Sequence, residues 1–118
     1  MYLAVPLDTY IERYRECIRT LLRKYGTPAS ANEEVEAQVI EDVEHDHYQL
    51  VHVGWQNKRR VYGCVAHIDI RNGKIWIQHD GTEIGMANEL VEMGIPKDEI
   101  VLGFQAPYKQ PYTGFATE

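Results

Sequence analysis

The stretch "HIDIRNGKIWIQHDGTE", residues 67 to 83, decides the fold because it reads as a β-hairpin that leads into a helix. Apolar and polar residues alternate on both sides of Asn72-Gly73, and this dipeptide favours a type I′ turn, in which both central residues take positive φ. A two-residue turn pairs Arg71 with Lys74 and brings one set of side chains onto a common face, the predicted core: Ile68, Ile70, Ile75 and Ile77.

Polar side chains share the opposite face of this hairpin, since neighbouring residues of a strand point to opposite sides. Regular pairing also places His79 on the core face, at the end of the strand. Alternation accounts for the polar cluster without a reaction centre. We interpret the cluster, together with the aromatic residues of the tail, as a candidate partner-binding surface: His67, Asp69, Trp76, Gln78, Tyr108, Tyr112 and Phe115.

A period of two also runs through residues 34–66, which predicts further antiparallel strands with short turns at residues 44–47 and 56–59. With the hairpin these strands form a four-strand meander, and residues 100–104 predict a short fifth strand. The tail that follows is expected to be an extended arm held by Tyr108, Tyr112 and Phe115.

The turn at residues 56–59 pairs Trp55 with Arg60 and so fixes the register of its two strands. His52 and His67 then share a face but stand about four strand residues apart, roughly 13 Å, which is too far for one zinc ion. The other expected pairs are Val53 with Tyr62 and Val51 with Cys64 on the apolar face, and His52 with Gly63 and Tyr48 with His67 on the opposite face.

An N-terminal segment has the period of an amphipathic helix. Thr9 and Glu12 have the spacing of a capping box, and Gly26 with Pro28 forms a stop signal. The predicted apolar face of this helix contains Ile11, Tyr14, Ile18, Leu21, Leu22 and Tyr25.

A second, shorter helix is expected after the hairpin. Asp80 is predicted to cap it, with Glu83 at its third position, and Gly94 and Pro96 to end it; its apolar residues are Ile84, Ala87, Leu90 and Val91. The sequence therefore predicts an α+β fold in one domain, residues 1–118, with an antiparallel sheet packed against an N-terminal helix and a second shorter helix.

Composition limits the kind of protein. The 118 residues are about one domain long, and 44% hydrophobic with 25% charged residues is ordinary for a folded soluble domain. No apolar run approaches the ~18 residues of a membrane span, so we expect a cytoplasmic protein. Cys17 and Cys64 form no CxxC pair and are expected to be reduced core thiols. The net charge of −6 argues against non-specific DNA binding and favours protein partners.

Charge is unevenly distributed along the chain. Residues 29–57 are acidic and residues 58–74 are basic, which favours charge pairing between neighbouring strands. Three arginines lie at i, i+4 and i+8 on the first helix, within reach of Glu12 and Glu16, and we interpret them as a solvated face. The alternative hypothesis is direct DNA binding through a basic surface: Arg15, Arg19, Arg23, Lys58, Arg59 and Arg60.

An enzyme is the least favoured interpretation. His45, Asp46, His47 or Asp80 are the candidates for a metal-dependent hydrolase or nuclease, but the sequence has no [D/E]-x-K motif, and the nearest match is Asp69-Ile70-Arg71. It also lacks a G-x-S-x-G elbow, a P-loop and a dinucleotide-binding glycine motif. We therefore expect no catalytic residue, no metal ligand and no cofactor.

Three long stretches carry a family resemblance: "YRECIRTLLRKY" at residues 14–25, "DHYQLVHVGWQNKRRVYGCVAHIDIRNGKIWIQHDGTE" at residues 46–83, and "ELVEMGIPKDEIVLGFQAPYKQPYTGFA" at residues 89–116. In these stretches the chain closely resembles the XisI family, named as the fdxN element excision controlling factor of filamentous nitrogen-fixing cyanobacteria. The likeness runs from the first helix to nearly the last residue.

The resemblance implies a small cytoplasmic α+β protein that works with a companion, XisH, and a site-specific recombinase, XisF. The three are implied to act when a DNA element is excised in cells that differentiate into heterocysts. The resemblance implies a controlling factor rather than the recombinase, and it supplies no catalytic residues. Independently, an exposed edge strand and the aromatic tail predict a homo-oligomer.

Overall fold

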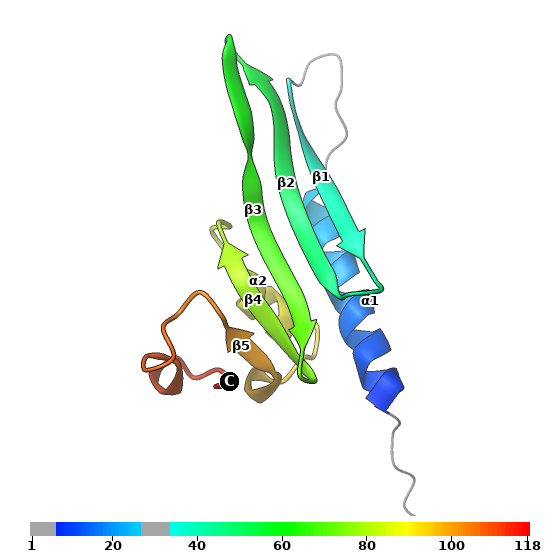
Figure 1. Cartoon of the computed structure of the whole chain (residues 1–118), viewed down its shortest axis with the longest axis vertical. Coiled ribbons are helices and arrows are strands. Elements are labelled where there is room, and N and C mark those ends of the chain that lie inside the picture. Colours follow the sequence, from blue (N-terminus) through cyan, green and yellow to red (C-terminus); the bar gives the residue numbers. More distant parts are fainter. Residues whose placement is uncertain (1–6, 27–33) are drawn as a thin grey trace, which may run out of the picture.

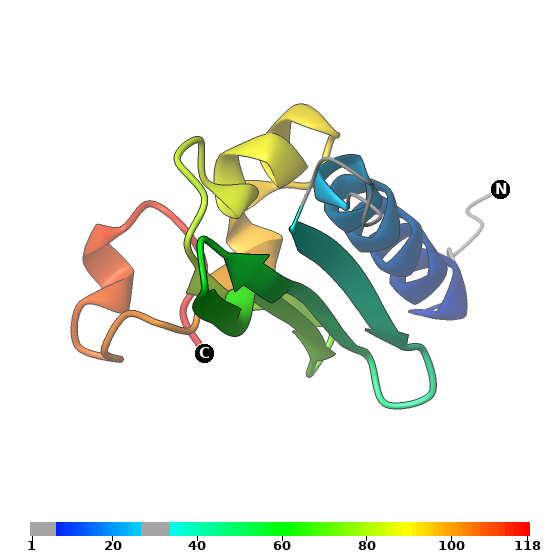
Figure 2. The ribbon, with the colours of Figure 1, turned by 90° about the horizontal axis from the view of Figure 1, so that it is seen from above.

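The structure, a computed structural model, describes residues 7–26 and 34–118. Both helices lie on one face of a five-stranded sheet with the order β1-β2-β3-β4-β5 (Figures 1 and 2). Strands β1 to β4 are antiparallel and β5 is parallel to β4, so the α+β prediction is confirmed with a mixed sheet. The elements are α1 (Leu7–Tyr25), β1 (Val35–Asp42), β2 (His47–Gln56), β3 (Arg59–Arg71), β4 (Lys74–Asp80), α2 (Met86–Glu92) and β5 (Ile100–Leu102).

Helix α1 buries the apolar face predicted for it. It ends at Tyr25, where Gly26 donates its backbone N–H to carbonyl oxygens of the preceding turn. It begins at Leu7, before the predicted capping residue Thr9, whose side chain lies outside the described residues. Packing against the sheet therefore defines this helix, through Tyr14, Ile18, Leu21 and Leu22, with Ile11 and Tyr25 at the margin.

The hairpin of β3 and β4 forms the centre of the sheet as predicted. Asn72 and Gly73 have φ of 52° and 75°, which agrees with the expected turn. Ile68, Ile75 and Ile77 are fully buried under the helices. Each such side chain contributes about 1.5–3 kcal/mol through burial, so this hairpin supplies a substantial part of the core.

One extra residue in β3 changes the register that regular alternation predicts. The pairs nearest the turn follow the prediction, but the next pair joins Leu50 to Ala66, which leaves Val65 without a partner in β2. This is a β-bulge, and the predicted faces of the residues on its distal side are therefore wrong. The residues predicted in the core, Val51, Val53, Tyr62 and Cys64, lie on the face turned away from the helices, and His52 lies on the helix side, where it lines a cavity with Tyr25 and Leu50.

Two further expectations fail for the same reason. His67 pairs with Gln49 instead of Tyr48. Cys64 is exposed rather than a core thiol, because the bulge turns its side chain to the face away from the helices; Cys17 is partly buried.

A second irregularity lies between β3 and β4. Ile68 pairs with Ile77 and His67 pairs with His79, so Gln78 is the extra residue in β4. Regular pairing would put His79 on the core face, but the shift leaves it exposed.

Helix α2 begins at Met86 and not directly after Asp80, so the predicted cap position is wrong. Asp80 nevertheless accepts a hydrogen bond from the backbone N–H of Met86 at 2.7 Å, across a short loop that its carboxylate also holds through Thr82. Ile84 lies in that loop and is exposed, whereas Ala87 and Leu90 are buried. Neither described helix is long and apolar enough to cross a membrane.

The C-terminal segment closes part of the second face of the sheet. Val101 of β5 and Ala116 bury Trp76 in a small separate cluster, and Ala116 donates its N–H to the carbonyl of Ile100 at 2.8 Å. Tyr108 and Tyr112 are exposed, so they do not hold the segment as predicted. Phe115 is partly buried beside the main core.

Buried Glu89 of α2 joins the two helices. Its carboxylate accepts hydrogen bonds from Lys24 Nζ at 2.7 Å and from the hydroxyl of Tyr25. Burial raises the pKa of Glu89, but the hydrogen bonds from Lys24 and Tyr25 outweigh this effect, so the pKa is lowered. The bond to Glu89, assisted by burial, raises the pKa of Tyr25 to about 12.

We expect Glu89→Gln to lower the free energy of unfolding at pH 7 by about 1–3 kcal/mol, because buried charged hydrogen bonds are lost. Urea denaturation followed by circular dichroism measures the change. Glu92→Gln, at an exposed position in the same helix, is the matched control and should change stability by less than about 0.5 kcal/mol. Equal losses in the two variants would contradict this role of Glu89.

The same carboxylate predicts a pH dependence. Because the folded pKa of Glu89 lies below its unfolded value of about 4.5, its contribution is complete above that pH and is lost as pH falls through the folded pKa. The stability difference between the unmodified protein and Glu89→Gln should therefore shrink below that pH. Urea midpoints measured from pH 7 into the acid range test this; a constant difference would show that the charge of Glu89 contributes nothing.

Candidate functional site

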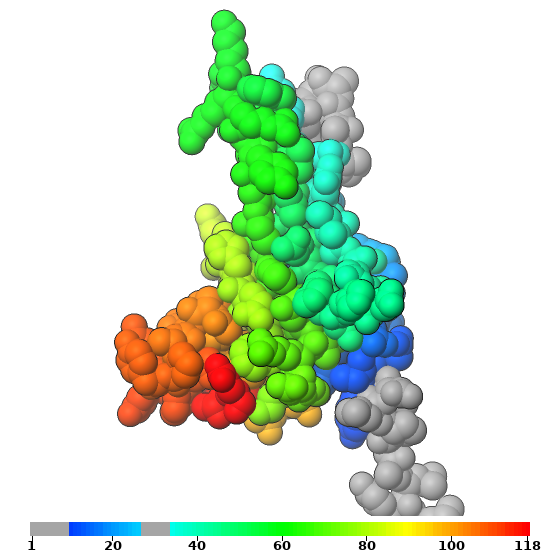
Figure 3. Space-filling view, in the orientation of Figure 1, coloured from blue at the N-terminus to red at the C-terminus, as the bar shows by residue number. Residues whose placement is uncertain are grey.

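The face of the sheet turned away from both helices is open over β1, β2 and β3, and Figure 3 shows it. We call it the open face and define it by the outward residues Gln38, Ile40, His47, Gln49, Val53, Trp55, Tyr62, Cys64, His67 and Asp69. Large hydrophobic side chains are exposed on it: Trp55 is 54% exposed and Tyr62 is 73% exposed. Arg60 lies over the Trp55 ring, 5.4 Å from its centroid.

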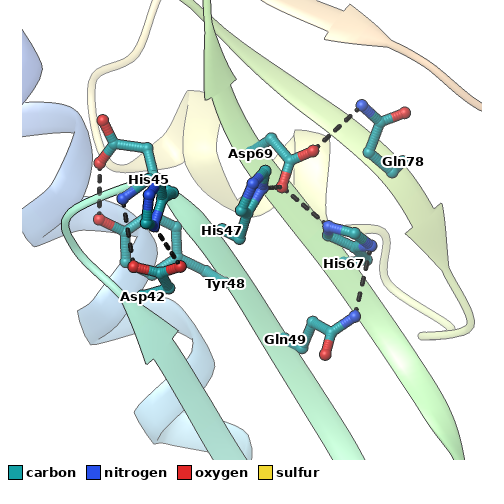
Figure 4. Close-up of polar contacts among 9 residues, drawn as sticks. Asp42, His45, His47, Tyr48, Gln49, His67, Asp69 and Gln78 are labelled. Carbon is teal, nitrogen blue, oxygen red and sulfur yellow. Dashed lines mark hydrogen bonds and ion pairs between the residues drawn. The ribbon is translucent and has the colours of Figure 1, made fainter.

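A cluster of two histidines and one aspartate occupies the part of the open face nearest the core. The pairing of β2 with β3 places His47 directly opposite Asp69. Asp69 Oδ1 lies 2.8 Å from His47 Nδ1 and 2.8 Å from His67 Nε2 (Figure 4). One donor atom from each of these residues falls within 4.8 Å of the other two. We call these residues the His–Asp cluster.

Two glutamines flank the His–Asp cluster (Figure 4). Gln78 Nε2 donates to Asp69 Oδ2 at 3.3 Å, and the Gln49 amide lies 3.5 Å from His67 Nδ1. Asp69 is only 8% exposed, whereas the His47 side chain is 57% exposed. The hydrogen bond that His47 donates to Asp69, together with the negative charge of Asp69, raises the pKa of His47.

The two aspartates proposed for a hydrolase site, Asp46 and Asp80, accept hydrogen bonds that stabilise the fold. Asp46 accepts from Arg15 Nε at 2.7 Å and from the Tyr48 hydroxyl at 2.9 Å, and Asp80 accepts from the backbone N–H of Met86. His45 Nδ1 pairs with Asp42 Oδ2 at 2.9 Å. These contacts explain the residues by local structure, without a reaction.

The predicted partner-binding surface is only partly assembled. His67, Asp69 and Gln78 lie together, but Trp76 is buried beneath the C-terminal segment. Tyr108, Tyr112 and Phe115 belong to that segment, which lies beyond β5 (Figure 1). The exposed residues of the predicted set therefore divide between the open face and the C-terminal segment.

The α1 arginines of the predicted basic surface have carboxylate partners. Arg19 and Arg23 bind Glu41 of β1 at 3.0 and 2.9 Å, and Arg15 binds Asp46 as well as Glu12. Charge pairing thus joins helix to sheet, and the expected pairing of Glu41 and Asp46 with neighbouring strands is wrong. Lys58, Arg59 and Arg60 are exposed at the tip of the β2–β3 hairpin.

Sequence reasoning missed the place of His47 and the exposure of Tyr62. Val65 is apolar like its neighbours, so the alternation through Cys64 and Ala66 looks unbroken and hides the bulge. The difference in strand length was the signal that could have shown this exposure. Because β3 has 13 residues and β4 only 7, the distal half of the β2–β3 hairpin has to extend beyond the core.

Together these features define a small α+β protein whose sheet is open on one face. A family model described as "XisI protein" matches residues 8–117. The chain belongs to the XisI family, and the resemblance drawn from its sequence is confirmed.

Two solved structures are similar to the chain, both from Anabaena variabilis ATCC 29413. A XisI-like protein is 45% identical with a TM-score of 0.83, over 92% of this chain and 99% of that one. The fdxN element excision controlling factor XisI is 35% identical with a TM-score of 0.75, over 91% of this chain and 97% of that one. The search of curated proteins finds no match.

The His–Asp cluster predicts a measurable titration. Because Asp69 raises the pKa of His47, this imidazole should titrate above the ordinary value of about 6.5. Asp69→Asn should lower the pKa of His47 toward that value, as followed by proton–nitrogen NMR of the ring in the presence of a chelator. Asp42→Asn, which removes the partner of His45 and a smaller charge effect on His47, is the comparison and should lower the pKa of His47 less. An unchanged His47 titration in Asp69→Asn would contradict the contact.

Proposed function

We propose that this chain is a non-catalytic controlling factor that binds an XisH-type protein partner and so biases the excision of a DNA element by a site-specific recombinase. The match to the XisI family over residues 8–117 carries the proposal. The name of one solved relative, an fdxN element excision controlling factor, supports the regulatory role.

We further propose that the partner binds on the open face, near the tip of the hairpin. Trp55 and Tyr62 lie on adjacent strands and on the same side, since Trp55 pairs with Arg60 and Tyr62 with Val53. Aromatic residues and arginine are enriched in protein interfaces, where they supply most of the binding energy. The cation–π contact of Arg60 with Trp55 adds a further recognition group beside the indole.

Electrostatics supports a protein partner over DNA. The net charge is −6, and Arg15, Arg19 and Arg23 are paired with carboxylates of the same chain. Direct DNA binding therefore rests on the three basic residues of the hairpin tip. Few phosphate contacts give weak binding that salt abolishes.

The proposal is tested by co-purification of the untagged full chain with a tagged XisH-type partner encoded beside it. We expect association with the unmodified chain and at least about tenfold weaker binding for Trp55→Ala or Tyr62→Ala, since truncation of an aromatic residue at the centre of an interface costs about 2 kcal/mol or more. Tyr10→Ala is the matched control, because Tyr10 is an exposed tyrosine on α1.

The outcomes are distinguishable. Tyr112→Ala tests the C-terminal segment, and a loss of binding only in this variant would move the interface there. If the two unmodified proteins fail to associate, partner binding is contradicted. If the unmodified chain then binds duplex DNA and Arg59→Glu does not, the DNA-binding hypothesis replaces it. Light scattering on the same chain tests the proposed homo-oligomer, and a strict monomer would overturn that part.

A further inference from the structure

We propose that the His–Asp cluster, His47, His67 and Asp69, is a binding site for a divalent transition-metal ion of the zinc class. The sequence alone favoured no metal ligand, because the bulge that brings His47 opposite Asp69 is not visible in it. The site is separate from the proposed function, since metal binding is measured on the chain without any partner.

The ligand types select the class of ion. Two imidazole nitrogens and one carboxylate oxygen are the donors of three-ligand zinc sites, and the same set suits divalent iron, cobalt and nickel. Magnesium and calcium prefer oxygen donors only, so they are poor candidates. Three protein ligands leave at least one coordination position for water.

The geometry needs only small adjustment. His67 and Asp69 are separated by one residue on β3, and His47 is the cross-strand neighbour of Asp69, so all three point to the open face. Asp69 Oδ1 is already 2.8 Å from each imidazole nitrogen. Ligand atoms around a tetrahedral zinc ion lie about 3.4 Å apart, given bonds of about 2.0–2.2 Å, so an ion enters if each contact lengthens by under about 1 Å.

Neighbouring side chains already orient the donors. Gln78 holds Asp69 Oδ2, which leaves Oδ1 for a single metal bond. The Gln49 amide contacts His67 Nδ1, the ring nitrogen opposite Nε2, and with its oxygen turned inward it accepts the proton that a metal-bound imidazole carries there. Asp69 is buried while His47 is exposed, so one side of the site is fixed and the other is open to solvent.

The experiment uses the untagged full chain after treatment with a chelator. Cobalt(II) is titrated while the visible absorption is followed, and zinc affinity is measured by calorimetry. We expect one ion per chain. Loss of a hydrogen bond to a metal ligand typically weakens metal binding by about 10- to 100-fold. Gln78→Ala removes such a bond and should weaken binding by about tenfold. His47→Ala and His67→Ala each remove a ligand and should weaken binding by more than about 100-fold.

His52→Ala is the matched control, because His52 lies on the helix side of the sheet, and it should bind as the unmodified chain does. Circular dichroism confirms that each variant is folded; the exposed position of His47 makes its variant the safest. Absence of saturable binding, or an affinity in both His47→Ala and His67→Ala equal to that of the unmodified chain, would overturn the site. So would a loss in His45→Ala without one in His67→Ala, because this moves the ion to the stacked His45–His47 pair.

Discussion

The bulge at Val65 is the constraint on which the arrangement of side chains depends. A strand alternates with a period of two, so one unpaired residue reverses every face beyond it. On the core side of the bulge Ala66 and Ile68 point to the helices, and on the distal side Cys64 and Tyr62 point away from them. Without it, Tyr62 would face the helix side, opposite to Trp55. Because of the bulge, Trp55 and Tyr62 near the tip of the hairpin lie on the same face of the sheet as the His–Asp cluster.

On the face of the sheet that the helices cover, ion pairs join α1 to β1 and to the turn that follows it. The arginines at i, i+4 and i+8 meet Glu41 and Asp46, which lie at the end of β1 and in the turn that follows. Exposed pairs of this kind contribute little to stability, about 0–1 kcal/mol each, so apolar packing remains the main contact between α1 and the strands. The basic stripe thus has an intramolecular explanation, and the acidic segment that looked like a separate feature is its counterpart.

Local pattern predicted most of the fold. The Asn72-Gly73 turn, the alternating strands and the apolar stripe of α1 depend on neighbours in sequence, so they could be read directly. Contacts between residues far apart in the sequence could not be predicted in this way. The cover over Trp76 comes from Val101 and Ala116, and no local signal couples these residues to β4.

The candidate site shows the same division. Asp69 and His67 were placed correctly relative to the turn, because no irregularity separates Asp69 from it and the shift at Gln78 lies in the other strand. Their distance from His47 depends on the register of the β2–β3 hairpin. That register could not be predicted, because the bulge residue Val65 is apolar and does not interrupt the apolar pattern.

The length of the β2–β3 hairpin bears on how members of this family diverge. None of the buried core residues in the described chain comes from residues 52–64, so the distal half is held by strand pairing and its own side chains. Its tip can change in sequence, or gain and lose residue pairs, with little effect on folding. The core and the surface of the tip can therefore change independently of each other, although both belong to one small domain.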